Sequence, residues 1–130
     1  MLIVDTSVWV EVLRDAAKRM VLEGAVGSGD IALTRFTQLE LLQGGRDERE
    51  WRLLAEHLEG QDYVEMTPRT WPEAARIYFD LRREGKTVRS PIDCCIAQLV
   101  IEYDGELLHC DREFEVIATI RNLRQRRLDL

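Results

Sequence analysis

Short runs of apolar residues alternate along the chain with longer segments in which apolar residues recur every three or four positions. Residues 1–5 form a short apolar run that ends at a carboxylate, which is typical of a strand buried on both faces. From Ser7 to Val21 the apolar residues follow a helical spacing of about 3.6, and Gly24 and Gly27 indicate where the segment ends. This part of the chain predicts a strand followed by one amphipathic helix.

The same alternation continues along the rest of the sequence. Ser90-Pro91 suits the start of one helix, and Thr34 or Thr37 suits the start of another. Thr70 stands three residues before Glu73, which is a capping-box spacing. We predict further strands at residues 31–33, 63–66 and 107–111. We also predict five further helices: one that ends at Gly44, one around residues 51–58, one over 70–85, one over 91–105 and one that begins near Phe114. Strands that alternate with helices indicate an α/β fold with a largely parallel central sheet flanked by helices, because parallel neighbours need crossover connections.

The composition fits one globular domain. The 130 residues are 45% hydrophobic and 32% charged, with no linker, repeat or polar low-complexity tract, so we expect residues 1–130 to form a single domain. The apolar runs are too short to span a bilayer and no signal segment precedes Asp5, which predicts a cytoplasmic protein without membrane contact. Three cysteines suit neither a disulfide framework nor a zinc site, and we expect Cys94, Cys95 and Cys110 to lie in the core.

Four acidic residues stand where the predicted sheet would gather them. Asp5 and Asp111 end two predicted strands. Glu40 lies in the helix after the second strand, and Asp93 lies in the first turn of the helix that begins at Ser90. Because sites in open parallel sheets form beyond the carboxyl ends of the strands, we expect all four carboxylates to converge.

Convergence of these carboxylates requires a cation. Two carboxylates about 4 Å apart repel by about 4 kcal/mol at an effective dielectric of about 20. Hard oxygen ligands suit Mg²⁺ or Mn²⁺, and such a site can activate a water for displacement at phosphorus. Each acid taken alone also has a structural interpretation as a helix cap or a turn residue, but the ordered set favours phosphodiester hydrolysis. The net charge of −6 argues against a protein that coats nucleic acid, yet it does not exclude an enzyme that uses carboxylates.

Four short motifs that contain these acids occur in order along the chain. They are Val4-Asp5-Thr6-Ser7-Val8-Trp9, Leu39-Glu40-Leu41-Leu42, Ser90-Pro91-Ile92-Asp93 followed by Cys94-Cys95-Ile96-Ala97, and His109-Cys110-Asp111-Arg112-Glu113-Phe114. Together they resemble the PIN-domain ribonucleases, and more closely the VapC toxins of bacterial toxin–antitoxin pairs. The resemblance covers essentially the whole chain. It implies a PIN-like domain that acts as a magnesium-dependent endoribonuclease, with Mn²⁺ able to substitute, and that hydrolyses RNA with a metal-activated water.

The resemblance also implies the catalytic and metal-binding residues, which are Asp5, Glu40, Asp93 and Asp111. Asp5 and Asp93 would bind the metal directly. Glu40 would be a ligand or a base that positions water, and Asp111 would be a direct or an outer ligand.

Three neighbouring residues are candidates for supporting this site. Thr6 or Ser7 would orient Asp5 or a water through its hydroxyl, although Ser7 could equally cap a helix. Glu115 lies four residues after Asp111 and would assist or replace it. Cys110 stands where the family often has a small polar residue.

A basic stretch and the family resemblance together indicate the partners. Residues 69–89 carry six basic and three acidic side chains. Arg82, Lys86 and Arg89 lead into the helix that carries Asp93, where they would hold RNA phosphates, or they would simply form a solvated helix end. The resemblance implies an RNA substrate such as tRNA or rRNA, a homodimer, and a VapB-like antitoxin whose arginine-bearing segment reaches the acidic site.

Two other functions stay open at the level of the sequence. One is a catalytically silent PIN-like module that binds RNA or protein. The other is a different magnesium-dependent phosphoryl-transfer domain, although a haloacid-dehalogenase-type phosphatase would need an aspartate where Ser7 stands. The phosphate loop of nucleotide hydrolases and the nucleophile elbow of α/β-hydrolases are both absent.

Overall fold

Five short strands form the centre of the computed structural model, which describes residues 1–130. The strands are β1 (Leu2–Val4), β2 (Ile31–Thr34), β3 (Tyr63–Val64), β4 (Glu106–His109) and β5 (Gln125–Arg127). They lie in the order β3-β2-β1-β4-β5, and every neighbouring pair is parallel. The predicted α/β fold with a parallel sheet is therefore confirmed.

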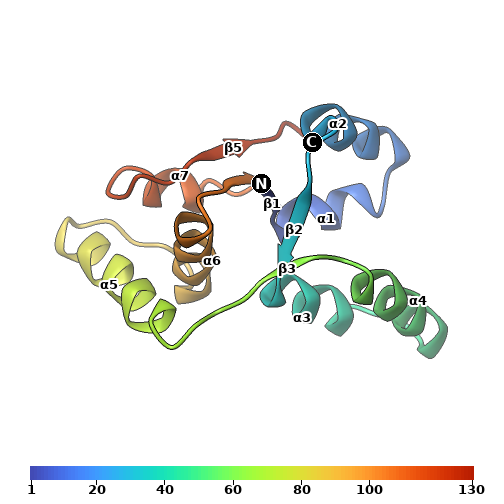
Figure 1. The fold of residues 1–130 in the computed structure, drawn as a ribbon, viewed down its shortest axis with the longest axis horizontal. Coiled ribbons are helices and arrows are strands. Elements are labelled where there is room, and N and C mark those ends of the chain that lie inside the picture. Colours follow the sequence, from blue (N-terminus) through green and yellow to red (C-terminus); the bar gives the residue numbers. More distant parts are fainter.

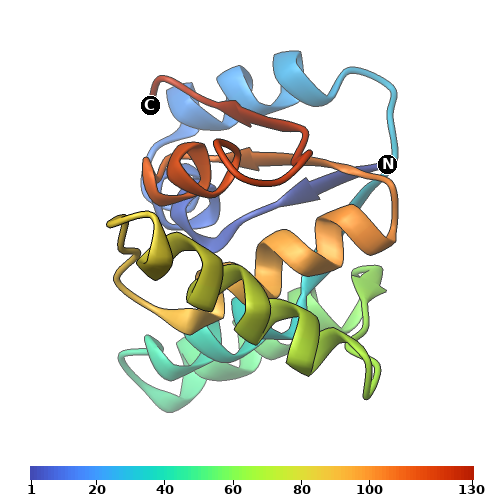
Figure 2. The ribbon, with the colours of Figure 1, turned by 90° about the vertical axis from the view of Figure 1, so that its left-hand side faces the viewer.

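Seven helices surround this sheet. They are α1 (Thr6–Val12), α2 (Ala16–Val26), α3 (Arg35–Gln43), α4 (Glu48–Glu59), α5 (Thr70–Arg83), α6 (Pro91–Glu102) and α7 (Glu113–Ile117). Helices α5, α6 and α7 contribute to the core on one face, and α1 to α4 contribute to the core on the other (Figures 1 and 2).

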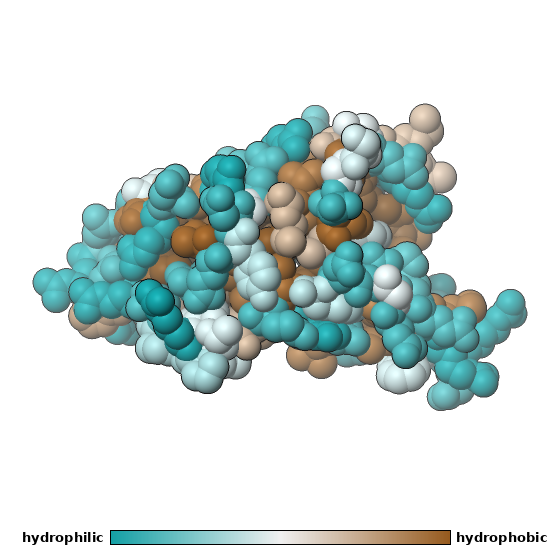
Figure 3. Space-filling view, in the orientation of Figure 1, coloured by the Kyte–Doolittle hydropathy of each residue, from teal (hydrophilic) through white to brown (hydrophobic).

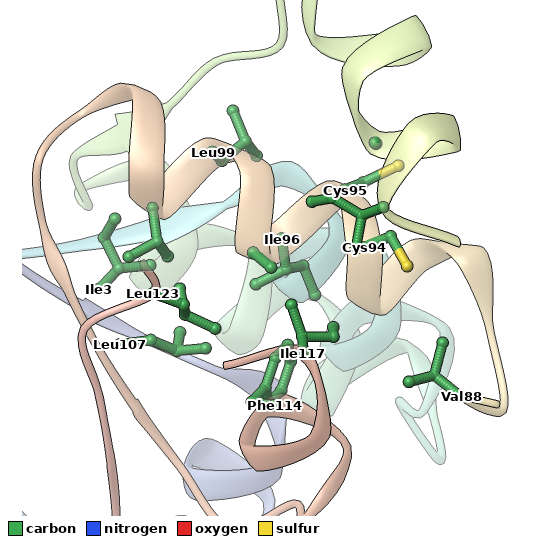
Figure 4. Close-up of a cluster of buried hydrophobic side chains, with 14 of the residues drawn as sticks. Ile3, Val88, Cys94, Cys95, Ile96, Leu99, Leu107, Phe114, Ile117 and Leu123 are labelled. Atoms are coloured by element: carbon green, nitrogen blue, oxygen red, sulfur yellow. The ribbon is translucent and has the colours of Figure 1, made fainter. Parts of the chain in front are cut away.

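Side chains of successive strand residues point to opposite faces of the sheet, which divides the buried apolar residues into two clusters. Ile3 and Leu107 pack on the side of α6 and α7, where Phe114 belongs to the same fully buried cluster (Figure 4). Val4 and Leu108 belong to the cluster on the side of α1 and α2. Strands β1 and β4 are thus buried on both faces, as their continuous apolar runs predict.

The segment predicted as one helix from Ser7 to Val21 is two helices. The chain leaves the helical path after Val12, and the Asp15 side chain caps α2 by accepting a hydrogen bond of 2.9 Å from the Ala17 amide. Aspartate competes with the helix by bonding nearby amides, and this favours a new N-terminus over continuation. The apolar spacing alone did not reveal this break.

Two further predictions need correction. The Thr70 side chain does not form a capping box, because its hydroxyl donates to Glu102 of α6 at 2.9 Å and links two helices instead. Strand β5 is absent from the prediction because its sequence, Gln-Arg-Arg, carries no apolar alternation. Backbone pairing with β4 holds it in the sheet, and the Leu107 amide donates to the Arg124 carbonyl at 2.9 Å.

The surface is largely hydrophilic. In the view of Figure 3, hydrophilic side chains cover most of the face, and the visible hydrophobic ones gather mainly near its middle. None of the helices combines the length and the apolar character that crossing a bilayer would require.

Truncating a residue of β4 tests the packing of the sheet. Leu107 is 0% exposed, so Leu107→Ala removes buried methyl groups and leaves a cavity, and the free energy of unfolding should fall by about 2–5 kcal/mol. Leu53 of α4 is 56% exposed, and Leu53→Ala should cost no more than about 0.5 kcal/mol. Urea denaturation of the two variants measures both values, and equal losses would contradict the described core.

Candidate active site

The carboxyl ends of two adjacent strands carry aspartates. Strands β1 and β4 pair in parallel with Val4 opposite Leu108, and the Asp5 amide donates to the Leu108 carbonyl at 2.9 Å. Asp5 and Asp111 therefore follow neighbouring strands at the same edge of the sheet, on the left in Figure 2. This edge is where the order of the strands in the sheet predicts a site, because β1 lies at its centre between β2 and β4.

Asp5 is held in one orientation by Ser7. The Ser7 amide and hydroxyl donate to Asp5 Oδ2 at 3.0 and 2.6 Å, and the Ser7 hydroxyl in turn accepts the Cys110 amide at 2.9 Å. Asp5 is only 7% exposed, and burial raises its pKa, while the hydrogen bonds from Ser7 partly oppose the rise. Asp5, and not Ser7, is the residue that caps α1.

The pKa of Asp93 is strongly shifted at this edge. It lies in the first turn of α6, which Ser90 caps by accepting the Ile92 amide at 3.1 Å. Burial and the negative charges of Asp111, Asp5 and Glu113 raise the pKa of Asp93 from 3.8 to about 7, and the positive charge of Arg89 opposes them. Three other carboxylates are thus close enough to Asp93 to disfavour its ionisation.

Asp111 lies between a helix and an arginine. Its Oδ1 accepts the Glu113 amide at 3.0 Å, and its Oδ2 accepts Arg89 Nη2 at 2.7 Å. Arg89 Nε also lies 3.8 Å from Glu113 Oε1. Arg89 is therefore the counter-charge of the acidic cluster.

Glu113 is a site residue that sequence reasoning missed. Its side chain is 13% exposed, and its Oε2 atom is buried without a hydrogen-bond partner. The available signal was its position, two residues after Asp111 in the first turn of the short helix α7. Glu115 attracted the prediction instead, but it is exposed and pairs with Arg127 at 3.0 Å.

Glu40 approaches the site from another direction. It is exposed on α3, and its Oε1 accepts the Thr6 hydroxyl at 2.9 Å. The Thr6 hydroxyl also lies 2.9 Å from that of Thr37, whose amide is bonded to the Thr34 cap of α3. The Thr6 hydroxyl therefore contacts Glu40 and not Asp5, and Glu40 is not among the groups that shift the pKa of Asp93.

The predicted phosphate ligands differ in their positions. Arg89 contacts the acidic cluster, as described above. Lys86 donates to the Thr119 hydroxyl at 2.9 Å and lies 3.9 Å from Glu84, whereas Arg82 lies over the Tyr78 ring. Neither Lys86 nor Arg82 pairs with one of the site carboxylates.

An open hollow of about 490 Å³ lies beside the cluster. Its lining includes Ser7, Asp111 and Glu113 together with the arginines Arg89, Arg112 and Arg127. Cys110 also lines the hollow and is half-buried, so the prediction that all three cysteines lie in the core holds only for Cys94 and Cys95. Burial raises the pKa of the Cys110 thiol, which disfavours the reactive thiolate.

The donor set fits a hard divalent cation. All of the converging groups are carboxylates, and the buried, unpartnered Glu113 Oε2 is available to a cation. The side chains as placed do not form a ready-made cluster of three ligands, and the Asp111 carboxylate is bonded to Arg89. A cation bound here would have to replace this contact with Arg89.

The repulsion at Asp93 should lower the free energy of unfolding of the metal-free protein at neutral pH. The pKa of Asp93 is raised in the folded protein, so the folded form loses stability as the pH rises from about 4 to about 7, where the unfolded chain ionises freely. Asn does not titrate, and Asp93→Asn should therefore stabilise the metal-free protein at pH 8 by about 1–2 kcal/mol, a value reduced for solvent screening. The gain should vanish near pH 4.

Denaturant titrations in chelator at the two pH values measure this effect. Asp62→Asn, at an exposed position before β3, is the matched control and should show no such dependence on pH. A gain at pH 4 as large as that at pH 8 would show that the substitution does not act through ionisation.

Comparisons with known proteins identify the family of this chain. The family model described as PIN domain matches residues 2–120. Ribonuclease VapC11 of Mycobacterium tuberculosis is 34% identical over 131 residues, which cover 95% of this chain and 96% of that protein.

Two solved structures have the same fold. VapBC-1 of nontypeable Haemophilus influenzae has a TM-score of 0.79 at 16% identity and covers 97% of this chain and 96% of its own. VapBC2 of Rickettsia felis, bound to a promoter DNA fragment, has a TM-score of 0.78 at 19% identity. The match covers 99% of this chain and 100% of that chain. The chain belongs to the PIN-domain family and, within it, to the VapC ribonucleases.

Proposed function

We propose that this chain is the toxin of a toxin–antitoxin pair and that it cleaves RNA as a magnesium-dependent endoribonuclease. The observation that carries the proposal is the cluster of carboxylates, Asp5, Asp111 and Glu113, whose charges act on Asp93. Such a cluster is stabilised by a divalent cation, and phosphodiester hydrolysis is the chemistry that a carboxylate-held cation promotes. The relatives named as VapC ribonucleases support the same activity.

Asp5 and Asp93 are the proposed direct ligands, and Asp111 and Glu113 complete the site. Asp5 is buried and already oriented by Ser7, which reduces the reorganisation required on binding. When bound, Mg²⁺, or Mn²⁺ in its place, supplies an acidified water and positive charge beside the scissile phosphate. Glu40 is the proposed residue that orients the attacking water, and the Thr6 hydroxyl holds its carboxylate.

Arg89 has two proposed partners, which it binds at different times. Without a cation it neutralises Asp111. Its side chain is 75% exposed and lines the hollow, so after release from Asp111 it can bind an RNA phosphate. Lys86 and Arg82 are proposed as more distant phosphate ligands on the same approach.

The proposed protein partners come from the solved relatives. Their titles name complexes of VapB with VapC, and we propose a VapB-like antitoxin for this chain as well as a homodimer. The RNA substrate belongs, on this proposal, to the tRNA or rRNA class.

Removing single carboxylates tests the activity. Asp5→Asn, Asp93→Asn and Glu113→Gln should each lower the rate of magnesium-dependent RNA cleavage at least about 100-fold, because each weakens the hold on the cation. Glu115→Gln is the matched control on α7, and it should change the rate by less than about twofold since Glu115 pairs with Arg127.

Gel assays on a structured RNA, with and without Mg²⁺, measure these rates. Cleavage that persists in excess chelator, or equal rates for all four variants, would contradict the proposal. RNA binding without cleavage by the wild-type protein would instead favour the catalytically silent module.

Removing Arg89 should have two opposite effects. Arg89→Ala deletes one phosphate contact, so RNA binding should weaken and the slope of log K against log salt should fall by about 1. The variant should also need less Mg²⁺ for half-maximal activity, because Asp111 is no longer paired. Arg52→Ala, an exposed change on α4, should alter neither quantity. An unchanged salt slope in Arg89→Ala would contradict the proposed phosphate contact and would indicate that Arg89 is only a solvated side chain.

A further inference from the structure

His109 is a buried polar residue immediately before the acidic edge. It is the last residue of β4, it is 0% exposed, and its ring packs edge-to-face on Phe114 with the centroids 5.1 Å apart. A buried imidazole is costly unless both of its nitrogens have partners. Both do here: one partner is the backbone amide of Asp111 and the other is the side chain of Gln125.

The hydrogen bonds fix the position of the ring proton. The Asp111 amide donates to His109 Nδ1 at 3.1 Å. Since an amide is always a donor, Nδ1 must be unprotonated, and the neutral ring carries its proton on Nε2. Nε2 then donates to Gln125 Oε1 at 2.6 Å.

His109 and Gln125 are both anchored by the sheet. Gln125 begins β5, which runs beside β4 in Figure 2, and its register partner is Leu107. The Leu128 amide donates to the His109 carbonyl at 2.8 Å, which fastens β5 to His109 a second time. The imidazole therefore connects a fixed edge strand to the backbone of Asp111.

The backbone of Asp111 controls two of the acids in the cluster. Asp111 directs its own carboxylate and, through Oδ1, caps the amide of Glu113 at the start of α7. A shift of the Asp111 amide would move both carboxylates together. Groups that orient metal ligands in this way commonly change metal affinity about 10- to 100-fold when they are removed.

We propose that His109 and Gln125 are positioning residues that hold Asp111 and Glu113 in place for the cation. The inference rests on the proposed function, because it assigns Asp111 and Glu113 to a metal site. On this inference β5, a strand without apolar residues, helps to position the carboxylates at the active-site edge of the sheet. Neither His109 nor Gln125 is proposed to contact RNA or the cation.

Substitutions at the two positions separate positioning from folding. Gln125→Leu removes the acceptor of the Nε2 proton, and His109→Leu removes both bonds. His109→Asn retains an oxygen at the position of Nδ1 and can still accept the Asp111 amide. Arg126→Gln is the matched control, because it removes an ion pair with Glu106 from the same strand without touching this chain of bonds.

Titration of the folded proteins with Mn²⁺, followed by electron paramagnetic resonance, measures cation affinity without RNA. Gln125→Leu should weaken Mn²⁺ binding about 10-fold, and His109→Asn should bind more tightly than His109→Leu. Arg126→Gln should bind like the wild type. In cleavage assays Gln125→Leu should lower kcat while leaving KM for RNA within about twofold, since Gln125 positions a ligand and does not bind substrate.

A nitrogen-15 NMR spectrum of the wild-type imidazole provides a third readout, and it should show the proton on Nε2. A proton on Nδ1, or wild-type Mn²⁺ affinity in both Gln125→Leu and His109→Leu, would overturn the inference. Absence of RNA cleavage by a wild-type protein that shows the predicted Mn²⁺ affinities would overturn the proposed function and leave the positioning role standing.

Discussion

The parallel pairing of β1 with β4 is the constraint on which the rest of the structure depends. The bond from the Asp5 amide to the Leu108 carbonyl places the ends of the two strands side by side, and with them Asp5 and the turn that leads to Asp111. Both strands are buried on both faces, so this register cannot slip without exposing apolar side chains. The acids are thus brought together by hydrophobic burial, against their own repulsion.

The surrounding residues compensate for this repulsion in different ways. Ser7 satisfies Asp5 by hydrogen bonds, Arg89 neutralises Asp111, and the raised pKa of Asp93 lets it hold a proton. Each arrangement stabilises the site without a cation and can be exchanged when one binds. The net charge of −6 is therefore compatible with an RNA substrate, because on the proposed function the acids at this edge bind a cation, and arginines line the hollow beside them.

Sequence reasoning succeeded where one strong local signal acted alone. The apolar run before Asp5 and the Ser90-Pro91 start of α6 were both read correctly. It failed where the outcome depended on tertiary partners: β5 exists only because β4 pairs with it, and Thr70 bonds to α6 and not to its own helix. Glu113 was missed for the same reason, since only the fold distinguishes its buried carboxylate from the exposed one of Glu115.

The central claim is that the carboxylates at the ends of β1 and β4 hold one or more divalent cations. Anomalous diffraction from crystals of the protein soaked in Mn²⁺ tests it directly. The account predicts a strong anomalous peak bounded by Asp5, Asp93 and Asp111, with the Arg89 side chain turned away from Asp111. Saturating Mn²⁺ that produces no peak at this edge, with Arg89 still paired to Asp111, would contradict it.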